Sequence, residues 1–262
     1  MKKIITLLGI CSLIALFSCT KISGVDVTEY FDVSSYYTKL EVSDGMIVTV
    51  TDEVDDIVIT ADEGVMQKIV VRFTGSTLQI HRTDISLVYL THAEVLLPYN
   101  GDLRDIQIGY DSEFQTPYTI EGSNVKVKVD ERSKFSGYIL ADNLNMNVLN
   151  NSSVNSVFDV SEKFSLKIEN SSKAELDGYA PTVNLVMNDH STLERQWNGS
   201  HYAFMCDYCY GTMYGNCTAY IDCDSEIAMD VANYSILYYT SDPYLGESTV
   251  DDTSDFVYSG GY

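Results

Sequence analysis

Four cysteines lie within 18 residues near the C-terminus and form the densest group of reactive side chains in the sequence. They are Cys206, Cys209, Cys217 and Cys223. In an exported chain such a group favours disulfides, and a nested pairing, Cys206 with Cys223 and Cys209 with Cys217, is one of three connectivities. Unpaired buried thiols are the first alternative. A zinc or iron–sulfur site is least favoured, because the sequence has a single C-x-x-C pair followed by gaps that match no known ribbon spacing.

Catalytic triads and phosphate sites have no counterpart in the sequence. Asp189-His190-Ser191 has the composition of a hydrolase triad, but neighbouring residues of a strand or corner cannot converge on one substrate atom. The sequence contains no G-x-S-x-G, no glycine loop that would cradle phosphate and no H-E-x-x-H. The acidic clusters at 52–56 and 251–255 match no calcium loop, so we expect a solvated charged surface and neither a metal nor a cofactor.

A basic cluster is the best candidate for enzymatic chemistry. It consists of Lys126, Lys128, Arg132 and Lys134. On a strand, Lys126 and Lys128 share the side opposite the apolar residues, and polysaccharide lyases with a β-helix fold use outward lysine and arginine beside acidic calcium ligands. Ion pairing with acidic neighbours such as Asp130 and Glu131 is the simpler interpretation and is favoured.

Aromatic residues are concentrated at the C-terminal end, where residues 197–262 contain 11 of the 20 tyrosines. Tyrosine combines a flat apolar face with a polar rim, which suits it to recognition surfaces and to sugar rings. The candidate ligand-contacting residues are Trp197, Tyr202, Tyr210, Tyr214, Tyr220 and Tyr238. The alternative is that these side chains cap the open end of a repeat structure.

A repeat of about 20 residues must position these side chains. Apolar triplets at i, i+2 and i+4 begin at residues 106, 125, 144, 164 and 183, so the spacings are 19, 19, 20 and 19. The series opens with Ile106-Ile108-Tyr110 and continues with Phe204-Cys206-Tyr208 and Ile227-Met229-Val231. Similar polar corners follow three of the triplets: Asn150-Asn151-Ser152-Ser153, Glu169-Asn170-Ser171-Ser172 and Asn188-Asp189-His190-Ser191. This pattern predicts a parallel β-solenoid, favoured over a β-sandwich because hairpins would not repeat one corner in register.

Residues 31–98 show a different pattern, in which apolar and polar residues alternate in short runs separated by polar turns. Such runs predict antiparallel strands, the last of them at Glu94–Pro98. We therefore expect an all-β chain. An N-terminal antiparallel β region at 31–104 precedes a β-helix at 105–262, whose coils have about 19–21 residues and are aromatic-rich at the C-terminal end.

The N-terminus has the features of a lipoprotein leader. Lys2 and Lys3 precede 14 mostly apolar residues, which are too few to span a bilayer comfortably. Leu16-Phe17-Ser18-Cys19 resembles a lipobox, which predicts a signal peptide at 1–18, acylation of Cys19 and a tether at 19–30. Two acyl chains on one residue give stable membrane anchoring. A signal peptide that is cleaved without lipidation is the alternative.

Charge and composition exclude two classes of protein. Acidic residues number 38 against 16 basic residues, and the resulting net charge of −22 repels nucleic acid. The composition is 45% hydrophobic and 11% aromatic, which excludes a disordered chain.

Three features together match a known pattern: the alternating N-terminal strands, the repeated Asn-Ser-Ser corners and the segment Ser235–Pro243. They resemble the putative auto-transporter adhesin, head GIN domain family over roughly residues 30–260. Family members usually carry Ser-Gly-Ser or Ser-Gly-Ala corners, so the resemblance is one of pattern and not of identity. It implies a right-handed parallel β-helix, a lipoprotein or secreted protein of a Gram-negative bacterium and an adhesive role. It supplies no catalytic residues.

We therefore expect a non-enzymatic, lipid-anchored protein of the cell envelope at the outer membrane, facing either the periplasm or the outside. Its β-helix would present a binding face to a glycan or to another envelope or host component. The alternatives are a β-helix polysaccharide lyase or hydrolase, and a structural or regulatory envelope protein without an external ligand.

Overall fold

The computed structural model describes residues 24–33, 36–84, 91–195 and 204–259. Within these ranges the chain is all-β except for one helical turn, and its 19 strands form one continuous sheet. The N-terminal elements are β1 (Asp26–Phe31), β2 (Lys39–Val42), β3 (Met46–Thr51), β4 (Ile57–Asp62), α1 (Glu63–Met66), β5 (Ile69–Thr74), β6 (Thr77–Arg82) and β7 (Ala93–Pro98). The solenoid elements are β8 (Asp105–Ile108), β9 (Glu113–Val129), β10 (Lys134–Val148), β11 (Ser153–Ile168), β12 (Lys173–Asn188), β13 (Thr192–Arg195), β14 (Phe204–Tyr214), β15 (Thr218–Ala232), β16 (Ile236–Thr240), β17 (Tyr244–Leu245), β18 (Thr249–Val250) and β19 (Asp255–Tyr258).

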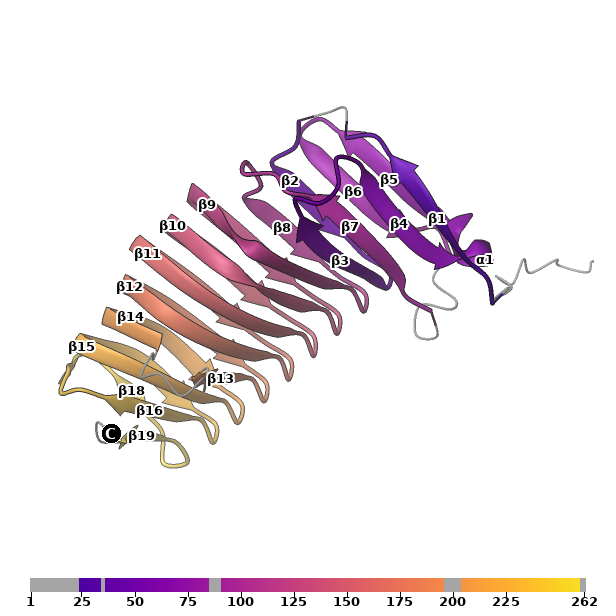
Figure 1. The fold of residues 1–262 in the computed structure, drawn as a ribbon. Helices are drawn as coiled ribbons and strands as arrows, with labels where there is room; N and C mark the ends of the chain where they lie inside the picture. The colour runs from indigo at the N-terminus through magenta and orange to yellow at the C-terminus, as the bar shows by residue number, and fades with distance from the viewer. Residues whose placement is uncertain (1–23, 34–35, 85–90, 196–203, 260–262) are drawn as a thin grey trace, which may run out of the picture.

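The predicted solenoid is confirmed, with about seven turns from residue 105 onward. Figure 1 shows an elongated stack in which β8 to β19 follow one another as coils, while β1 to β7 close the opposite end. Among the described residues, no helix is long and apolar enough to cross a membrane.

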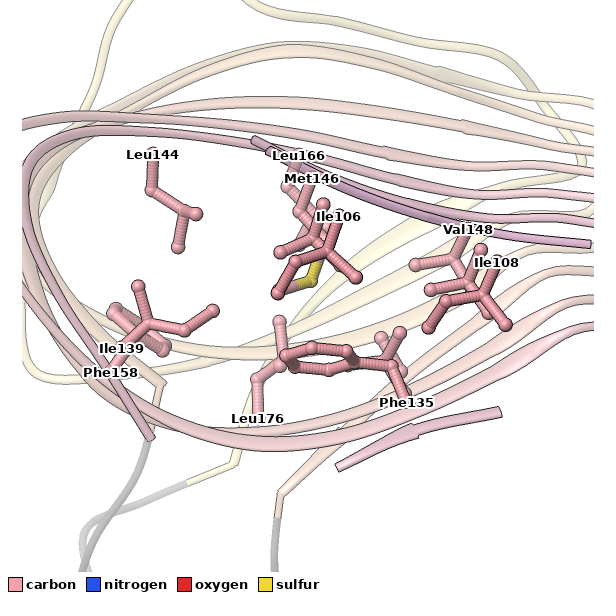
Figure 2. Packing of buried hydrophobic residues seen from close by; sticks show 14 of the residues in the cluster. Ile106, Ile108, Phe135, Ile139, Leu144, Met146, Val148, Phe158, Leu166 and Leu176 are labelled. Atoms are coloured by element: carbon pink, nitrogen blue, oxygen red, sulfur yellow. The ribbon is translucent and has the colours of Figure 1, made fainter. Parts of the chain in front are cut away.

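Each long strand of the solenoid bends once and therefore contributes to two sheets. We call the residues that follow a corner the first sheet and those that precede the next corner the second sheet. In β10 the parallel pairing with β11 shifts register between Ala141 and Asn143, which marks the bend. The two sheets face each other across the interior, as the view along the coils in Figure 2 shows.

Alternate side chains of both sheets point inward and form the core. In Figure 2, Phe135 and Leu176 of the first sheet face Met146 and other apolar residues of the second. The predicted triplets that begin at residues 125, 144, 164 and 183 are buried throughout. Two triplet assignments are wrong, because Tyr110 and Tyr208 are 48% and 40% exposed. Tyr110 lies at a corner with positive φ, and a register shift after Cys206 turns Tyr208 outward.

The corners consist of two residues in the left-handed region followed by a buried residue. Asn150 and Asn151 have φ values of 54° and 62°, and the next residue, Ser152, is buried. Its Oγ accepts the backbone N–H of Ser133 at 3.2 Å, and its own N–H donates to Ser172 Oγ at 3.2 Å. The buried corner residues form a column that we call the serine ladder: Ser112, Ser133, Ser152, Ser172, Ser191, Cys217 and Ser235. The ladder bonds that hold the corners supply partners for amides that would otherwise be buried unpaired.

The N-terminal region is mixed and not wholly antiparallel as predicted. β1 with β4, β4 with β7 and β5 with β6 are antiparallel, whereas β2 and β3 pair in parallel with β8 and β9 of the solenoid. The N–H of Gly45 donates to Tyr110 O at 2.9 Å and that of Met46 to Ser112 Oγ at 3.2 Å, which repeats the corner pattern. The region is therefore continuous with the first coil. β1 also occupies residues 26–31, so part of the predicted tether at 19–30 is a strand.

Candidate functional site

β14 carries three tyrosines on one side, in the second sheet. Because alternate residues of a strand point the same way, Cys209 and Met213 face the core while Tyr208, Tyr210 and Tyr214 face outward. A single strand thus presents an aromatic residue at three outward positions.

The geometry around these side chains combines parallel rings with a carboxylate. The rings of Tyr208 and Tyr210 have centroids 6.3 Å apart and an interplanar angle of 10°. The Tyr210 hydroxyl donates to Glu226 Oε2 of β15 at 3.5 Å, and the parallel register places Glu226 between Tyr208 and the exposed Tyr244 of β17. Desolvation and, after it, the Glu226 charge raise the pKa of Tyr210, so its hydroxyl stays a neutral donor. We call Tyr208, Tyr210, Tyr214, Glu226 and Tyr244 the tyrosine face.

Two other predicted ligand-contacting residues lie in the first sheet. Tyr220 of β15 and Tyr238 of β16 are register partners, and their rings stack with centroids 4.6 Å apart at an angle of 8°. The predicted tyrosines therefore divide between the two sheets and do not form one stripe. Trp197 and Tyr202 lie outside the described residues.

Three members of the tyrosine face were missed as candidate site residues from the sequence. Tyr208 had been assigned to an inward triplet, and Glu226 and Tyr244 lie on later coils whose register the sequence spacing does not define. The alternation of tyrosine at 208 and 210 was the available signal, because two residues of one type at i and i+2 share a side of a strand.

The basic residues do not converge on one site. Lys126 and Lys128 lie in the second sheet, Arg132 at a corner and Lys134 in the first sheet. Acidic neighbours pair with three of the four: Lys128 with Asp130 at 2.9 Å, Arg132 with Asp111 at 2.8 Å and Lys134 with Glu113. Partial burial opposes ionisation of Asp130, but hydrogen bonds from Lys128 and Asn150 outweigh it and lower the pKa of Asp130. The cluster is therefore a set of surface ion pairs spread around one coil.

The triad-like sequence at 189–191 forms a corner. Asp189 and His190 are exposed and in the left-handed region, whereas Ser191 is buried and donates its hydroxyl to Asn188 O. These three side chains do not point at one substrate atom. Across the described ranges, no group of three or more His, Cys, Asp or Glu side chains is placed to hold a metal ion.

All four cysteines are buried and carry free thiols in the structure. Cys206 of β14 and Cys223 of β15 are register partners that face the core. Cys209 faces a buried methionine, whereas Cys217 lies at a corner and donates its thiol to Tyr214 O at 3.1 Å. Five strand residues, roughly 16 Å, separate Cys209 from the end of β14 before that corner. The predicted pairing of Cys209 with Cys217 is therefore wrong.

Solved structures with the same fold include proteins from Parabacteroides and Bacteroides. A putative adhesin from Parabacteroides merdae is 12% identical, with a TM-score of 0.71, and the match covers 91% of this chain and 95% of that one. A putative lipid binding protein from Parabacteroides distasonis is 12% identical, with a TM-score of 0.70 and coverage of 92% and 98%. A putative adhesin from Bacteroides fragilis is 14% identical, with a TM-score of 0.53 and coverage of 91% and 96%.

These similarities support the fold alone, because sequence identities of 12–14% are too low to transfer an activity. No curated protein matches the chain with significant similarity. The family profile described as putative auto-transporter adhesin, head GIN domain, matches residues 36–239, which include β2 to β15 and most of β16. The chain therefore belongs to the putative auto-transporter adhesin, head GIN domain family.

Proposed function

We propose that this chain is a non-enzymatic binding module of the cell envelope that holds glycan on the tyrosine face. The observation that carries the proposal is the pair of nearly parallel rings, Tyr208 and Tyr210, beside the Glu226 carboxylate on an open sheet. The family description and the names of the similar structures agree with a binding role, and none of them names a catalytic activity.

Sugar rings offer apolar C–H surfaces and hydroxyl edges, which are the chemistry that this site complements. Aromatic rings supply rigid amphipathic area at little cost in side-chain entropy, and each contact contributes about 0.5–1.5 kcal/mol by analogy with aromatic pairs. Glu226 supplies acceptor oxygens for sugar hydroxyls at the side of the rings. Two or three such contacts give weak monovalent binding, which many copies on one membrane raise through avidity.

A glycan array followed by calorimetry tests this proposal. The purified protein is screened against bacterial and host polysaccharides, and the best ligand is then titrated against wild type and the double variant Tyr208→Ala with Tyr210→Ala. We expect affinity to fall about 5- to 150-fold, since two lost contacts amount to about 1–3 kcal/mol. Tyr138→Ala is the matched control, because Tyr138 is 38% exposed but lies in the first sheet.

Two outcomes would overturn the proposal. Binding that survives the double variant would remove the tyrosine face as its cause. Release of new reducing or unsaturated ends, abolished by Lys126→Ala, would establish a lyase or hydrolase in place of a binding module.

We further propose that the protein is lipid-anchored through Cys19 in the outer membrane. The support is the apolar leader and the lipobox-like Leu16-Phe17-Ser18-Cys19. Cells given an alkyne fatty acid should label the wild-type protein and not Cys19→Ala, and equal labelling of both proteins would contradict the assignment.

A further inference from the structure

Three of the four cysteines, Cys206, Cys209 and Cys223, are buried inside the solenoid on β14 and β15. Cys206 and Cys223 are also register partners on adjacent coils. Adjacent strands lie about 4.8 Å apart, and disulfides join Cα atoms about 4.4–6.8 Å apart, so this pair can be bridged with little movement of the backbone.

We propose that Cys206 and Cys223 form a disulfide that joins two consecutive coils, while Cys209 and Cys217 remain thiols. Cys206 could instead bond to Cys209, three residues away, but that bond would close a very short loop and remove little chain entropy. The bond to Cys223 closes a loop of 18 residues and constrains the unfolded chain far more.

Cys217 is excluded because it already serves as a member of the serine ladder. Its backbone N–H donates to Ser235 Oγ at 3.2 Å, as the N–H of Ser133 donates to Ser152 Oγ one ladder position at a time. Its thiol proton is donated to the carbonyl three residues earlier in the corner, Tyr214 O, just as Ser191 donates to Asn188 O. A disulfide at Cys217 would remove the thiol proton from this corner, and the corner lies roughly 16 Å along the strand from Cys209.

The proposed disulfide lies near the point where β12 changes its partner on the next coil. β12 runs without a break through Asp177, but its neighbour on the next coil is split, because Leu176 pairs with Arg195 of β13 and Gly178 pairs with Phe204 of β14. β14 therefore starts where β12 changes its partner. A covalent bond from Cys206 to the next coil fixes that start, two residues before the tyrosine face begins.

Bond formation requires a disulfide oxidant, such as oxidised glutathione or an oxidase that carries a disulfide. One cysteine thiolate attacks the oxidant and releases one reduced thiol, and the second thiolate then attacks the mixed disulfide and releases the other. Two electrons pass to the oxidant and two protons leave the cysteines. Both side chains are buried in the folded chain, where an oxidant cannot reach them. The exchange therefore takes place during folding, before the coil closes.

Oxidative refolding with peptide mapping tests the assignment without any glycan, so its outcome is independent of the proposed function. The full chain is refolded from the reduced, denatured state in a glutathione redox buffer, alkylated in denaturant and mapped by mass spectrometry. We expect Cys206 and Cys223 to be linked and Cys209 and Cys217 to be alkylated. Alkylation of all four, or a bond between any other pair, would overturn the proposal.

Melting curves test whether the bond braces the coils. The oxidised wild type should melt about 5–10 °C above the same protein after reduction. Cys209→Ser and Cys217→Ser should keep this difference in melting temperature, whereas Cys206→Ser should abolish it. Each variant is compared with itself with and without reductant, so that the effect of the disulfide is separated from any loss of packing caused by the substitution. If reduction does not change the melting temperature of the wild type, the proposal that a disulfide stabilises the coils is refuted.

Discussion

Removal of one hydroxyl from the serine ladder tests whether the corners hold the coils together. In Ser152→Ala the backbone N–H of Ser133 loses the Oγ atom that accepts it at 3.2 Å. Ser133 has no exposed surface, so water cannot replace that acceptor without local opening. An orphaned buried N–H costs about 1–3 kcal/mol, and we expect the free energy of unfolding to fall by that amount.

Urea unfolding followed by circular dichroism measures the loss. Ser153→Ala is the matched control, because Ser153 is the next residue, is half-buried and points outward; its effect should stay within about 0.5 kcal/mol. Ser152→Cys should lose less than Ser152→Ala, because sulfur is a weak acceptor for the Ser133 N–H and Cys217 already occupies an equivalent corner position. Equal losses in Ser152→Ala and Ser153→Ala would refute the assignment of stability to the ladder.

Three further perturbations have defined outcomes. Gly178→Ala should lower the free energy of unfolding by at least about 3 kcal/mol, because φ is 142° and an added Cβ would lie 1.8 Å from Phe158 O. Urea unfolding measures this loss, and a loss below about 1 kcal/mol would contradict the prediction. Tyr234→Asn should raise the free energy of unfolding by about 0.5–1 kcal/mol in the same assay, because Tyr234 is 65% exposed and has a φ of 63° that asparagine adopts with less strain. An unchanged or lower free energy of unfolding would count against backbone strain at this position. The hydrogen bond from the Asn233 N–H is the largest cause that lowers the pKa of Asp251, to about 2. Since this lies below the unfolded value of about 3.9, the last corner is stabilised above pH ~4 and loses that stabilisation as the pH falls toward 2. An NMR titration of Asp251 checks it, and a midpoint near the unfolded value would disprove it.

The solenoid was predictable because the positions of the apolar residues show both the length of one coil and the alternation of inward and outward side chains. A spacing of 19 or 20 between triplets cannot arise from hairpins that share one corner sequence, and the inward positions of β9 to β12 follow directly. The mixed pairing of β2 and β3 was not predictable. A strand's alternation shows which side is buried but carries no information about the direction of its neighbour.

The site residues were harder to predict because the chain changes phase at bends and corners. One register shift after Cys206 was enough to turn Tyr208 from an inward to an outward position. Cys217 was read as a disulfide partner because it follows Ser191 by 26 residues, and this spacing hides its equivalence to the serines of the other corners.

The serine ladder also has a direction. From Ser112 to Ser152, and again at Cys217 and Ser235, the backbone N–H of the ladder residue donates to the side chain of the coil that follows. The Ser235 N–H donates to Ser254 Oγ at 3.2 Å. In the last corner the donors turn back: the N–H of Thr253 donates to Asp251 Oδ1 at 3.0 Å and that of Ser254 to Asp251 O at 3.2 Å. The stack therefore satisfies its terminal donors within its own final corner, as an aspartate does at the start of a helix.

Because the coils stack in one direction and the last corner closes the stack, the number of coils sets the distance between the N-terminal end and the tyrosine face. β1 lies at one end of the molecule and β19 at the other, and the tyrosine face belongs to the coils near β19 (Figure 1). With the N-terminus at the membrane, as the proposed lipidation of Cys19 requires, the coils of β9 to β12 are a rigid spacer beneath the binding surface. One additional corner-to-corner unit among them would raise that surface by about 4.8 Å and leave every contact between β14 and β15 unchanged.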